Sequence, residues 1–313
     1  MAQFTTRPEI RGTFGAVAST HWLASAVGMS ILEKGGNAFD AATAAGFTLQ
    51  VVEPHLNGPL GEAPILVWSE ARRRCEMICG QGVAPAAATI GRFREVGLGL
   101  IPGTGLLAAT VPGAMGAWLR LLRDWGTMPL ADVLAPAIGY AESGYPVVER
   151  ISETIAAMTP MFRREWPSSA AVYLPHGRPP IPGRLFCNPA LAATYRRLLE
   201  ESGAGSRESR IERARAAWYQ GFVAEAIDHF CRHEQVIDSS GQRHGGLLSG
   251  DDMARWQPPV ERPVAFDYRG WTVMKGGPWS QGPVLLQTLA LLQGFDLEGL
   301  DPLGPEFVHL VVE

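Results

Sequence analysis

Helical and strand-like segments are mixed along this chain without regular alternation, and that order restricts the folds the chain can adopt. Apolar runs typical of strands lie at residues 64–68, 76–79, 264–268 and 272–275, and several other segments have the apolar spacing of helices. A TIM barrel or a Rossmann sheet needs a strand before almost every helix. The sequence therefore favours an α+β or layered α/β fold.

Capping residues predict the boundaries of the first two helices. Ser19 or Thr20 can cap a first helix, and the Gly-Gly-Asn segment at 35–37 predicts its end, because these residues tolerate positive φ. Asn37 or Asp40 then opens a second helix through residues 41–49.

Four further segments complete the coarse prediction. We expect a short strand over 15–19, a hairpin turn at Arg72–Arg74, a proline-rich loop over 166–189 and a polar linker over 203–210. No internal repeat or low-complexity segment divides the sequence. We therefore expect a single domain over residues 1–313.

The composition argues against several classes of protein. Hydrophobic residues make up 46% of the 313 residues and charged residues 19%, which is typical of a chain with a sizeable core rather than a disordered one. The net charge of −4 argues against a general partner of nucleic acid or anionic membranes. The sequence has no run of about 18 apolar residues and no apolar signal segment at its start. Because four cysteines make no disulfide framework here, we expect reduced thiols and a cytoplasmic protein.

Two histidines raise a metal hypothesis. His229 and His233 lie four residues apart on an expected helix, a spacing that can bring two imidazoles to one metal ion. No glutamate follows the first histidine, and Cys231 points to another face of the helix. Glu225 and the two histidines are equally a solvated polar stripe, which is the interpretation we favour. We therefore expect no metal and no cofactor, and a His-based metal hydrolase is the weaker alternative.

Two other motifs suggest chemistry less strongly. Gly103-Thr-Gly105 matches a loose dinucleotide pattern, but its proline- and glycine-rich surroundings favour a plain loop. Thr20 and His21 suggest a nucleophile–base pair, but adjacent residues on an opening helical turn face apart. Helix capping is the better interpretation of that pair.

The order of several short segments is more specific than any single motif. From about residue 11 to the end of the chain these segments are VASTH (17–21), ILEKGGNAFDAA (31–42), VEPH (52–55), VPG (111–113), WGTMPL (125–130), WYQG (218–221), GGLL (245–248), VERP (260–263), YRG (268–270) and GPWSQG (277–282). The ordered set resembles the large-subunit part of the gamma-glutamyltranspeptidase family of N-terminal-nucleophile (Ntn) hydrolases.

This resemblance implies a four-layer αββα Ntn fold, of which the chain is the large-subunit portion, in a proenzyme that cuts itself once. The cut frees a threonine at the start of a small subunit. Its hydroxyl attacks an amide carbonyl while its own α-amine acts as base, and the acyl-enzyme is released to water or an amine.

The resemblance also places the nucleophile downstream of the matched region. It therefore implies no catalytic residue within residues 1–313 and no activity of this chain alone. The implied partners are the small subunit of the same precursor and a small-molecule amide substrate, and a homo-oligomer is possible.

Two departures from the family pattern concern the substrate. Family transpeptidases carry an Arg-Glu-x-Ala-Pro segment whose arginine holds the glutamyl α-carboxylate, and here Gln81 takes that arginine's place. A neutral glutamine cannot make the bidentate, charged contact that arginine makes with a carboxylate. The glycine-dense segment is altered as well, at residues 57–62. Both changes favour the amidohydrolase and acylase-like branch, with enzymes resembling oxamate amidohydrolase or cephalosporin acylase.

Two alternatives stay open. The first is that Gln81 is a strand-end residue that touches no substrate. The second is that the chain as a whole is a non-catalytic remnant or a subunit that only binds a partner.

Overall fold

The computed structural model describes residues 11–313, and helices make up most of its secondary structure. Two short 3-10 turns, η1 (Leu106–Ala108) and η2 (Pro175–Gly177), accompany the α-helices. The α-helices in this range are α1 (Trp22–Glu33), α2 (Ala38–Val52), α3 (Ile90–Glu95), α4 (Ala114–Trp125), α5 (Leu130–Ser143), α6 (Glu149–Arg164), α7 (Pro167–Tyr173), α8 (Pro189–Glu201), α9 (Arg207–Tyr219), α10 (Phe222–His233), α11 (Gly250–Arg255), α12 (Gly282–Leu292) and α13 (Pro305–Val312).

The strands are short, and every pair they form in the described part of the chain is antiparallel. They are β1 (Ile65–Ser69), β2 (Arg74–Ile78), β3 (Tyr145–Pro146), β4 (Leu185–Phe186), β5 (Val236–Ile237), β6 (Arg243–His244), β7 (Val260–Glu261), β8 (Val264–Tyr268) and β9 (Trp271–Lys275). One sheet has the order β1-β2-β7, and β3–β4, β5–β6 and β8–β9 are separate pairs. The predicted turn at Arg72–Arg74 is confirmed, because β1 and β2 pair from Ser69↔Arg74 to Ile65↔Ile78.

Asn37 and Asp40 explain where the first two helices end and begin. Gly35 adopts φ +90° after α1, a conformation that glycine tolerates without strain. Asn37 Oδ1 accepts a hydrogen bond from Asp40 N (3.0 Å), and Asp40 Oδ2 accepts one from Asn37 N (2.9 Å). The buried Asp40 carboxylate also accepts bonds from the backbone of Thr127 (2.8 Å) and Met128 (3.1 Å). The cap of α2 therefore also fixes the turn between α4 and α5.

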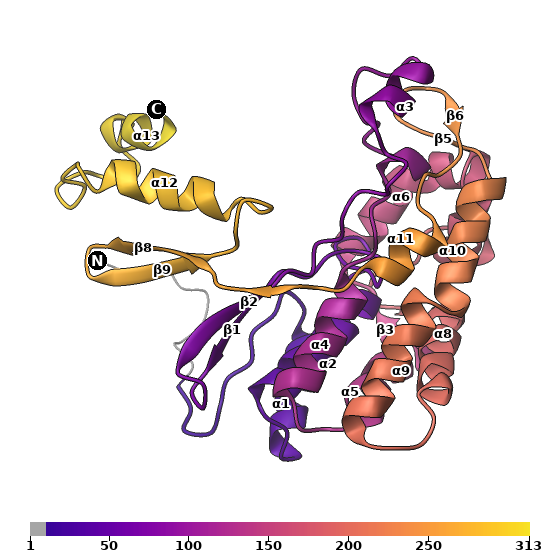
Figure 1. The fold of residues 1–313 in the computed structure, drawn as a ribbon, viewed down its shortest axis with the longest axis horizontal. Helices are drawn as coiled ribbons and strands as arrows, with labels where there is room; N and C mark the ends of the chain where they lie inside the picture. The colour runs from indigo at the N-terminus through magenta and orange to yellow at the C-terminus, as the bar shows by residue number, and fades with distance from the viewer. Residues whose placement is uncertain (1–10) are drawn as a thin grey trace.

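Helices α1, α2 and α4–α11 pack into what we call the helical body (Figure 1). Within it α2 contacts α1, α4 and α5, whereas α5 contacts α8 and α4 contacts α9. The large side chains Phe47, Tyr145, Tyr195 and Trp218 are almost completely buried in its shared core. Burial of such apolar surface is the main stabilising contribution to the body.

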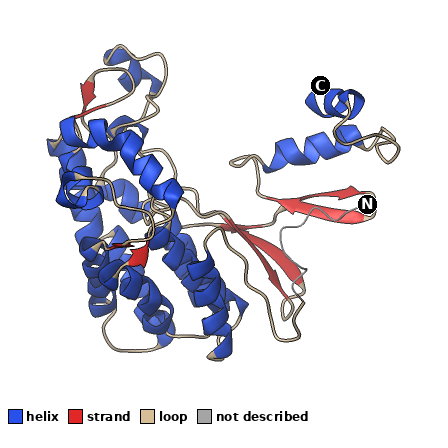
Figure 2. Cartoon of the chain, turned by 180° about the vertical axis from the view of Figure 1, so that it is seen from behind, coloured by secondary structure: helices blue, strands red, loops and turns tan. Residues whose placement is uncertain are grey.

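Beyond the β1–β2–β7 sheet, the chain leaves the helical body. A smaller core that includes Val67, Ile78 and Leu121 joins this sheet to α4. After β7 the chain forms the β8–β9 hairpin and helices α12 and α13, which lie apart from the helical body (Figures 1 and 2). We call residues 262–313 the C-terminal region. Its apolar side chains include Trp271 and Leu291, which are 77% and 72% exposed.

The structure confirms the mixed α+β class and corrects several local predictions. Residues 15–19 form no strand, because Val17 lies against Gly28 of α1 instead of pairing with another strand. Helix α1 is capped by His21, whose Nδ1 accepts a bond from Leu23 N (3.2 Å), and not by Ser19 or Thr20.

Two helices lie where the sequence predicted irregular structure. Ser206 caps α9, so the expected linker over 203–210 already becomes helical at Arg207. Helix α7 lies inside the expected proline-rich loop, with Pro167 at its first position, where the missing N–H costs nothing. No helix of the described chain is both long and apolar enough to cross a bilayer.

Candidate functional site

Gln81 lies just after β2, at a crossing of three chain segments. Ala63 N donates a hydrogen bond to Gly80 O (3.1 Å), and Val111 N donates one to Val83 O (3.0 Å). The Gln81 segment therefore lies between the residues that precede β1 and those that precede α4. We call this arrangement the crossing.

Glycines make the crossing possible. A Cβ atom on Gly82 would lie 1.5 Å from Val111 O, and one on Gly113 would lie 2.0 Å from Gly80 O. Gly61 O accepts hydrogen bonds from Gly113 N and Ala114 N, both 2.9 Å, at the start of α4. Because backbone packs directly on backbone here, the position of Gln81 is fixed by main-chain contacts.

The Gln81 side chain itself is exposed and has no hydrogen-bond partner within residues 11–313. Burial raises the pKa of the neighbouring Cys79 thiol. The weak hydrogen bond from Cys79 Sγ to Gln81 O (3.8 Å) lowers this pKa, whereas the carboxylates of Glu261 and Glu62 raise it. The crossing thus offers a neutral amide, and this group suits a neutral polar ligand better than an anion.

The arginines nearest to Gln81 in sequence are held at the opposite end of β2. Arg72 Nη1 and Arg74 Nη2 contact Glu76 at 3.0 and 2.7 Å, and the Arg72 guanidinium lies 4.6 Å from the centre of the Trp125 ring. Arg73 pairs with Glu70 in the turn. These three side chains are therefore not available to replace the family's arginine.

Thr20, His21, Glu53 and His55 form a cluster that sequence reasoning missed. Thr20 Oγ1 donates a hydrogen bond of 2.5 Å to Glu53 Oε2, and Glu53 and His21 are only 5% and 2% exposed. Burial lowers the pKa of His21 and of His55, and the Glu53 carboxylate partly offsets this for both. His21 Nε2 and His55 Nδ1 are buried without partners in the described chain. Thr20 thus faces a carboxylate and not His21, so the pair does not have nucleophile–base geometry.

The two histidines of the metal hypothesis stack on each other. The His229 and His233 rings lie 4.2 Å apart on the exposed side of α10, and His233 Nδ1 is 2.8 Å from His229 O. Cys231 is buried and faces the core. No group of three or more His, Cys, Asp or Glu side chains within residues 11–313 could hold a metal ion. This geometry supports the polar-stripe interpretation.

Gly103 and Gly105 lie in a loop against the β5–β6 hairpin. Gly103 N donates a hydrogen bond to Ser239 Oγ (2.8 Å), and Gly105 adopts φ +84° against Asp238. Only the three-residue turn η1 follows. The structure therefore lacks the strand and helix that a dinucleotide-binding turn requires.

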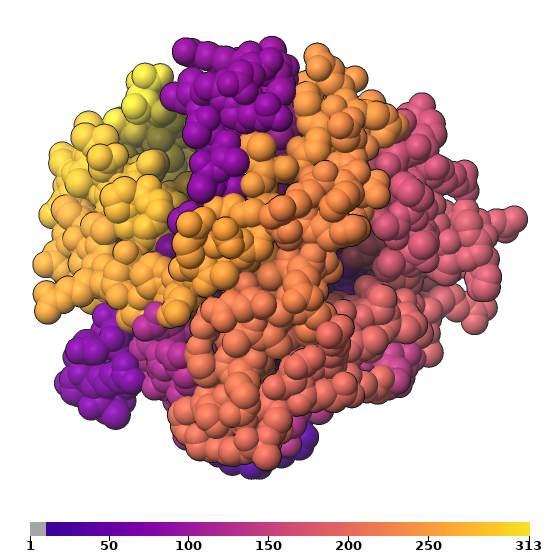
Figure 3. Space-filling view, turned by 45° about the vertical axis from the view of Figure 1, so that its right-hand side comes forward, coloured from indigo at the N-terminus to yellow at the C-terminus, as the bar shows by residue number. Residues whose placement is uncertain are grey.

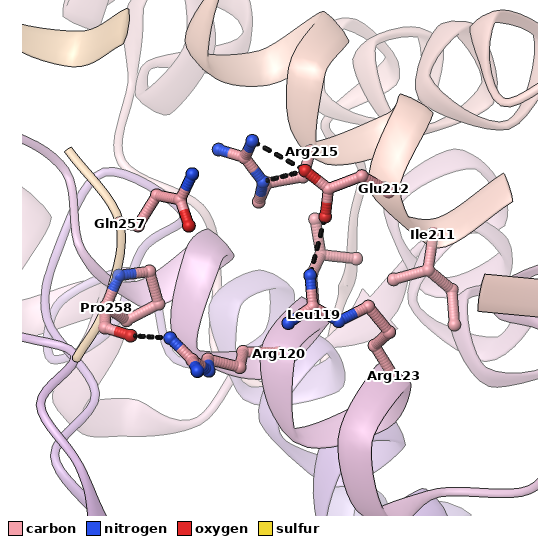
Figure 4. Close-up of a pocket in the computed structure, with 8 residues that line it drawn as sticks. All are labelled: Leu119, Arg120, Arg123, Ile211, Glu212, Arg215, Gln257 and Pro258. Atoms are coloured by element: carbon pink, nitrogen blue, oxygen red, sulfur yellow. Dashed lines mark hydrogen bonds and ion pairs between the residues drawn. The ribbon is translucent and has the colours of Figure 1, made fainter. Parts of the chain in front are cut away.

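A charged cavity between α4 and α9 has a structural role (Figure 4). Glu212 contacts Arg123 Nη1 at 2.7 Å and Arg215 Nη2 at 2.6 Å, while Arg120 Nη1 donates a bond of 2.5 Å to Pro258 O. The cavity measures about 10 Å³, which is room for one water molecule at most. These contacts join two helices to the segment that leads to β7.

Comparisons with known proteins support the family resemblance that the ordered sequence segments indicate. Residues 24–313 match the sequence profile of the family described as Gamma-glutamyltranspeptidase. The chain is 33% identical over 310 residues to the Glutathione hydrolase-like YwrD proenzyme of Bacillus subtilis (strain 168), covering 96% of this chain and 53% of that protein. It is 32% identical over 325 residues to the Acylase ACY 1 proenzyme of Pseudomonas sp. (strain SE83), covering 100% of this chain and 54% of that protein. The chain thus spans about half the length of the curated relatives it matches.

Solved structures of other proteins have a fold similar to that of this chain. One described as "Structure of LmbA2991HD" is similar with a TM-score of 0.93 and 54% identity, covering 98% of this chain and 52% of that chain. Helicobacter pylori gamma-glutamyltranspeptidase is similar with a TM-score of 0.84 and 28% identity, covering 97% of this chain and 82% of that chain.

Proposed function

Because the chain belongs to the gamma-glutamyltranspeptidase family, we propose that it is the large-subunit portion of an Ntn amidohydrolase for small amides without an acyl-side carboxylate. The expected fold, the large-subunit portion of the Ntn-hydrolase fold, is confirmed by the similar solved structures. The family match over residues 24–313 carries the proposal, and the neutral Gln81 supports the substrate class.

A second subunit from the same precursor completes the enzyme in this proposal, and residues 1–313 act as one domain. The curated relatives are about twice as long as this chain, which supports a partner of similar size. The C-terminal region supports it too, since Trp271 and Val312 are 77% and 74% exposed. β1 and the β8–β9 hairpin also have unpaired edges within the described residues, and such edges can pair with further strands.

The proposed reaction follows the family pattern. A threonine of the second subunit forms an ester with the acyl carbon as the amide C–N bond breaks, and its α-amine passes the hydroxyl proton to the leaving amine. Water then cleaves the ester, which releases the carboxylic acid and restores the threonine. Gln81 offers its amide group to the neutral amide end of the substrate, and the crossing holds Gln81 in place.

We assign the enzyme to the cytoplasm. All four cysteines, Cys75, Cys79, Cys187 and Cys231, are unpaired in the structure, which supports a reducing compartment.

Mass spectrometry of the protein expressed from its complete gene tests the proposal. We expect one internal cleavage that leaves an N-terminal threonine on the second chain. A small amide should then add the mass of its acyl group to that chain. A folded protein that neither cleaves nor becomes acylated would refute the proposal and support a non-catalytic remnant.

A further inference from the structure

We propose that an apolar pocket beside the crossing binds the hydrophobic part of the amide substrate, an inference that rests on the proposed function. The pocket measures about 860 Å³ and lies between α10, α8 and the segments 59–60 and 106–112. Figure 3 shows a hollow right of centre, between the orange and pink segments of the surface. Its volume is in the range of sites for small molecules, roughly 300–1,000 Å³.

The walls of this pocket are apolar and uncharged. Phe222, Ile227 and Phe230 of α10 line it together with Leu191 of α8 and with Leu60, which precedes β1. No acidic or basic side chain lines the pocket, and its hydroxyl groups are confined to Thr110, Ser168 and Thr194. A charged ligand would lose hydration here without gaining a partner, so the chemistry selects a neutral, hydrophobic group.

Two segments of chain border both the pocket and the crossing. Thr110 and Pro112 line the pocket, while Val111 between them donates its N–H to Val83 O (3.0 Å) and lies against Gly82. Leu60 also lines the pocket, and the next residue, Gly61, accepts the bonds from the start of α4.

In this proposal a single small molecule spans both places. Its amide end would lie at Gln81 and its hydrophobic end in the pocket. Leu60 and Phe230 are 53% and 41% exposed, so apolar side chains also lie where the pocket meets solvent. The substrate class that follows is an amide with a neutral acyl group several carbons long.

Binding of butylurea, hexylurea and octylurea tests this pocket without turnover, because these neutral molecules keep a hydrogen-bonding head. Calorimetry on the protein expressed from its complete gene should show affinity rising about fourfold per buried methylene, the factor equivalent to ~0.8 kcal/mol. Equal affinities for the three ureas, or no binding, would overturn the inference. The proposed function has a separate readout, the mass of the acylated threonine chain.

Two variants test whether octylurea binds in the apolar pocket. Ala226→Trp fills the pocket from α10 and Thr194→Phe fills it from α8, so we expect each to weaken octylurea binding at least tenfold. His229→Trp is the control, since His229 is exposed on α10 but outside the pocket. Circular dichroism confirms that each variant folds. Unchanged binding in both pocket variants, or an equal loss in His229→Trp, contradicts the assignment.

Discussion

The hydroxyl of Thr20 donates a hydrogen bond of 2.5 Å to Glu53 Oε2, although 33 residues separate the two in the chain. The contact joins the segment before α1 to the end of α2. It also leaves the next residue, His21, to cap α1 through its ring nitrogen. A threonine and a histidine that look like catalytic partners in the sequence therefore have separate structural roles.

Loss of the Thr20 hydroxyl should destabilise the protein. Thr20→Val leaves the buried Glu53 carboxylate without this donor, and a hydrogen bond to a charged group contributes about 1.5–3 kcal/mol. Thr20→Ser keeps the hydroxyl and is the control. Urea unfolding at neutral pH measures both variants. A Thr20→Val protein as stable as Thr20→Ser would show that the contact contributes nothing to stability.

The stability of the protein should fall as the pH decreases below about 6.5, the ordinary pKa of histidine. Burial lowers the pKa of His21 in the folded state, so the unfolded chain takes up its proton first as the pH falls. The free energy of unfolding then decreases by at most about 1.4 kcal/mol per pH unit for this group.

Urea unfolding between about pH 8 and pH 5 in wild type and in His21→Asn checks this dependence. Asparagine can still cap α1 but does not titrate, so the variant should lose less stability in acid. His229→Asn, on the exposed side of α10, is the control and should follow the wild type. Identical pH profiles for wild type and His21→Asn would refute the role of His21.

Gly82→Ala should disrupt the crossing. The added Cβ would lie 1.5 Å from Val111 O, and backbone atoms cannot move away as a flexible side chain would. We expect a loss of about 3 kcal/mol or more, or a protein that does not fold. Gly58→Ala is the matched control, because no atom lies within 4 Å of its added Cβ. Thermal unfolding compares the two, and equal melting temperatures would contradict the geometry described for the crossing.

Local signals predicted those parts of the fold that local chemistry determines. The Asn37 cap and the turn at Arg72–Arg74 were found because each depends on a few neighbouring residues. Helix α9 was missed because its first turns are rich in Arg and Glu, and burial of Ile211 and Trp218 against the body is visible only in the fold.

The candidate site likewise has one part that the sequence predicted and another that it could not predict. The match between Gln81 and the family's arginine could be predicted from the sequence, because the Ala-Pro pair at 84–85 corresponds to the end of the family's Arg-Glu-x-Ala-Pro segment. The contact between Thr20 and Glu53 and the apolar pocket could not be predicted, because both bring together residues far apart in the chain.

The central claim is that Gln81 directs the enzyme away from glutamyl substrates, and kcat/KM values for a gamma-glutamyl anilide and for hexanamide test it most directly. For the wild-type enzyme expressed from its complete gene, we predict a preference for hexanamide. In Gln81→Arg, a charged hydrogen bond to the α-carboxylate should raise relative glutamyl activity at least tenfold, because each ~1.4 kcal/mol is a factor of ten. A wild-type enzyme that prefers the glutamyl anilide, with that preference unchanged in Gln81→Arg, would contradict the account.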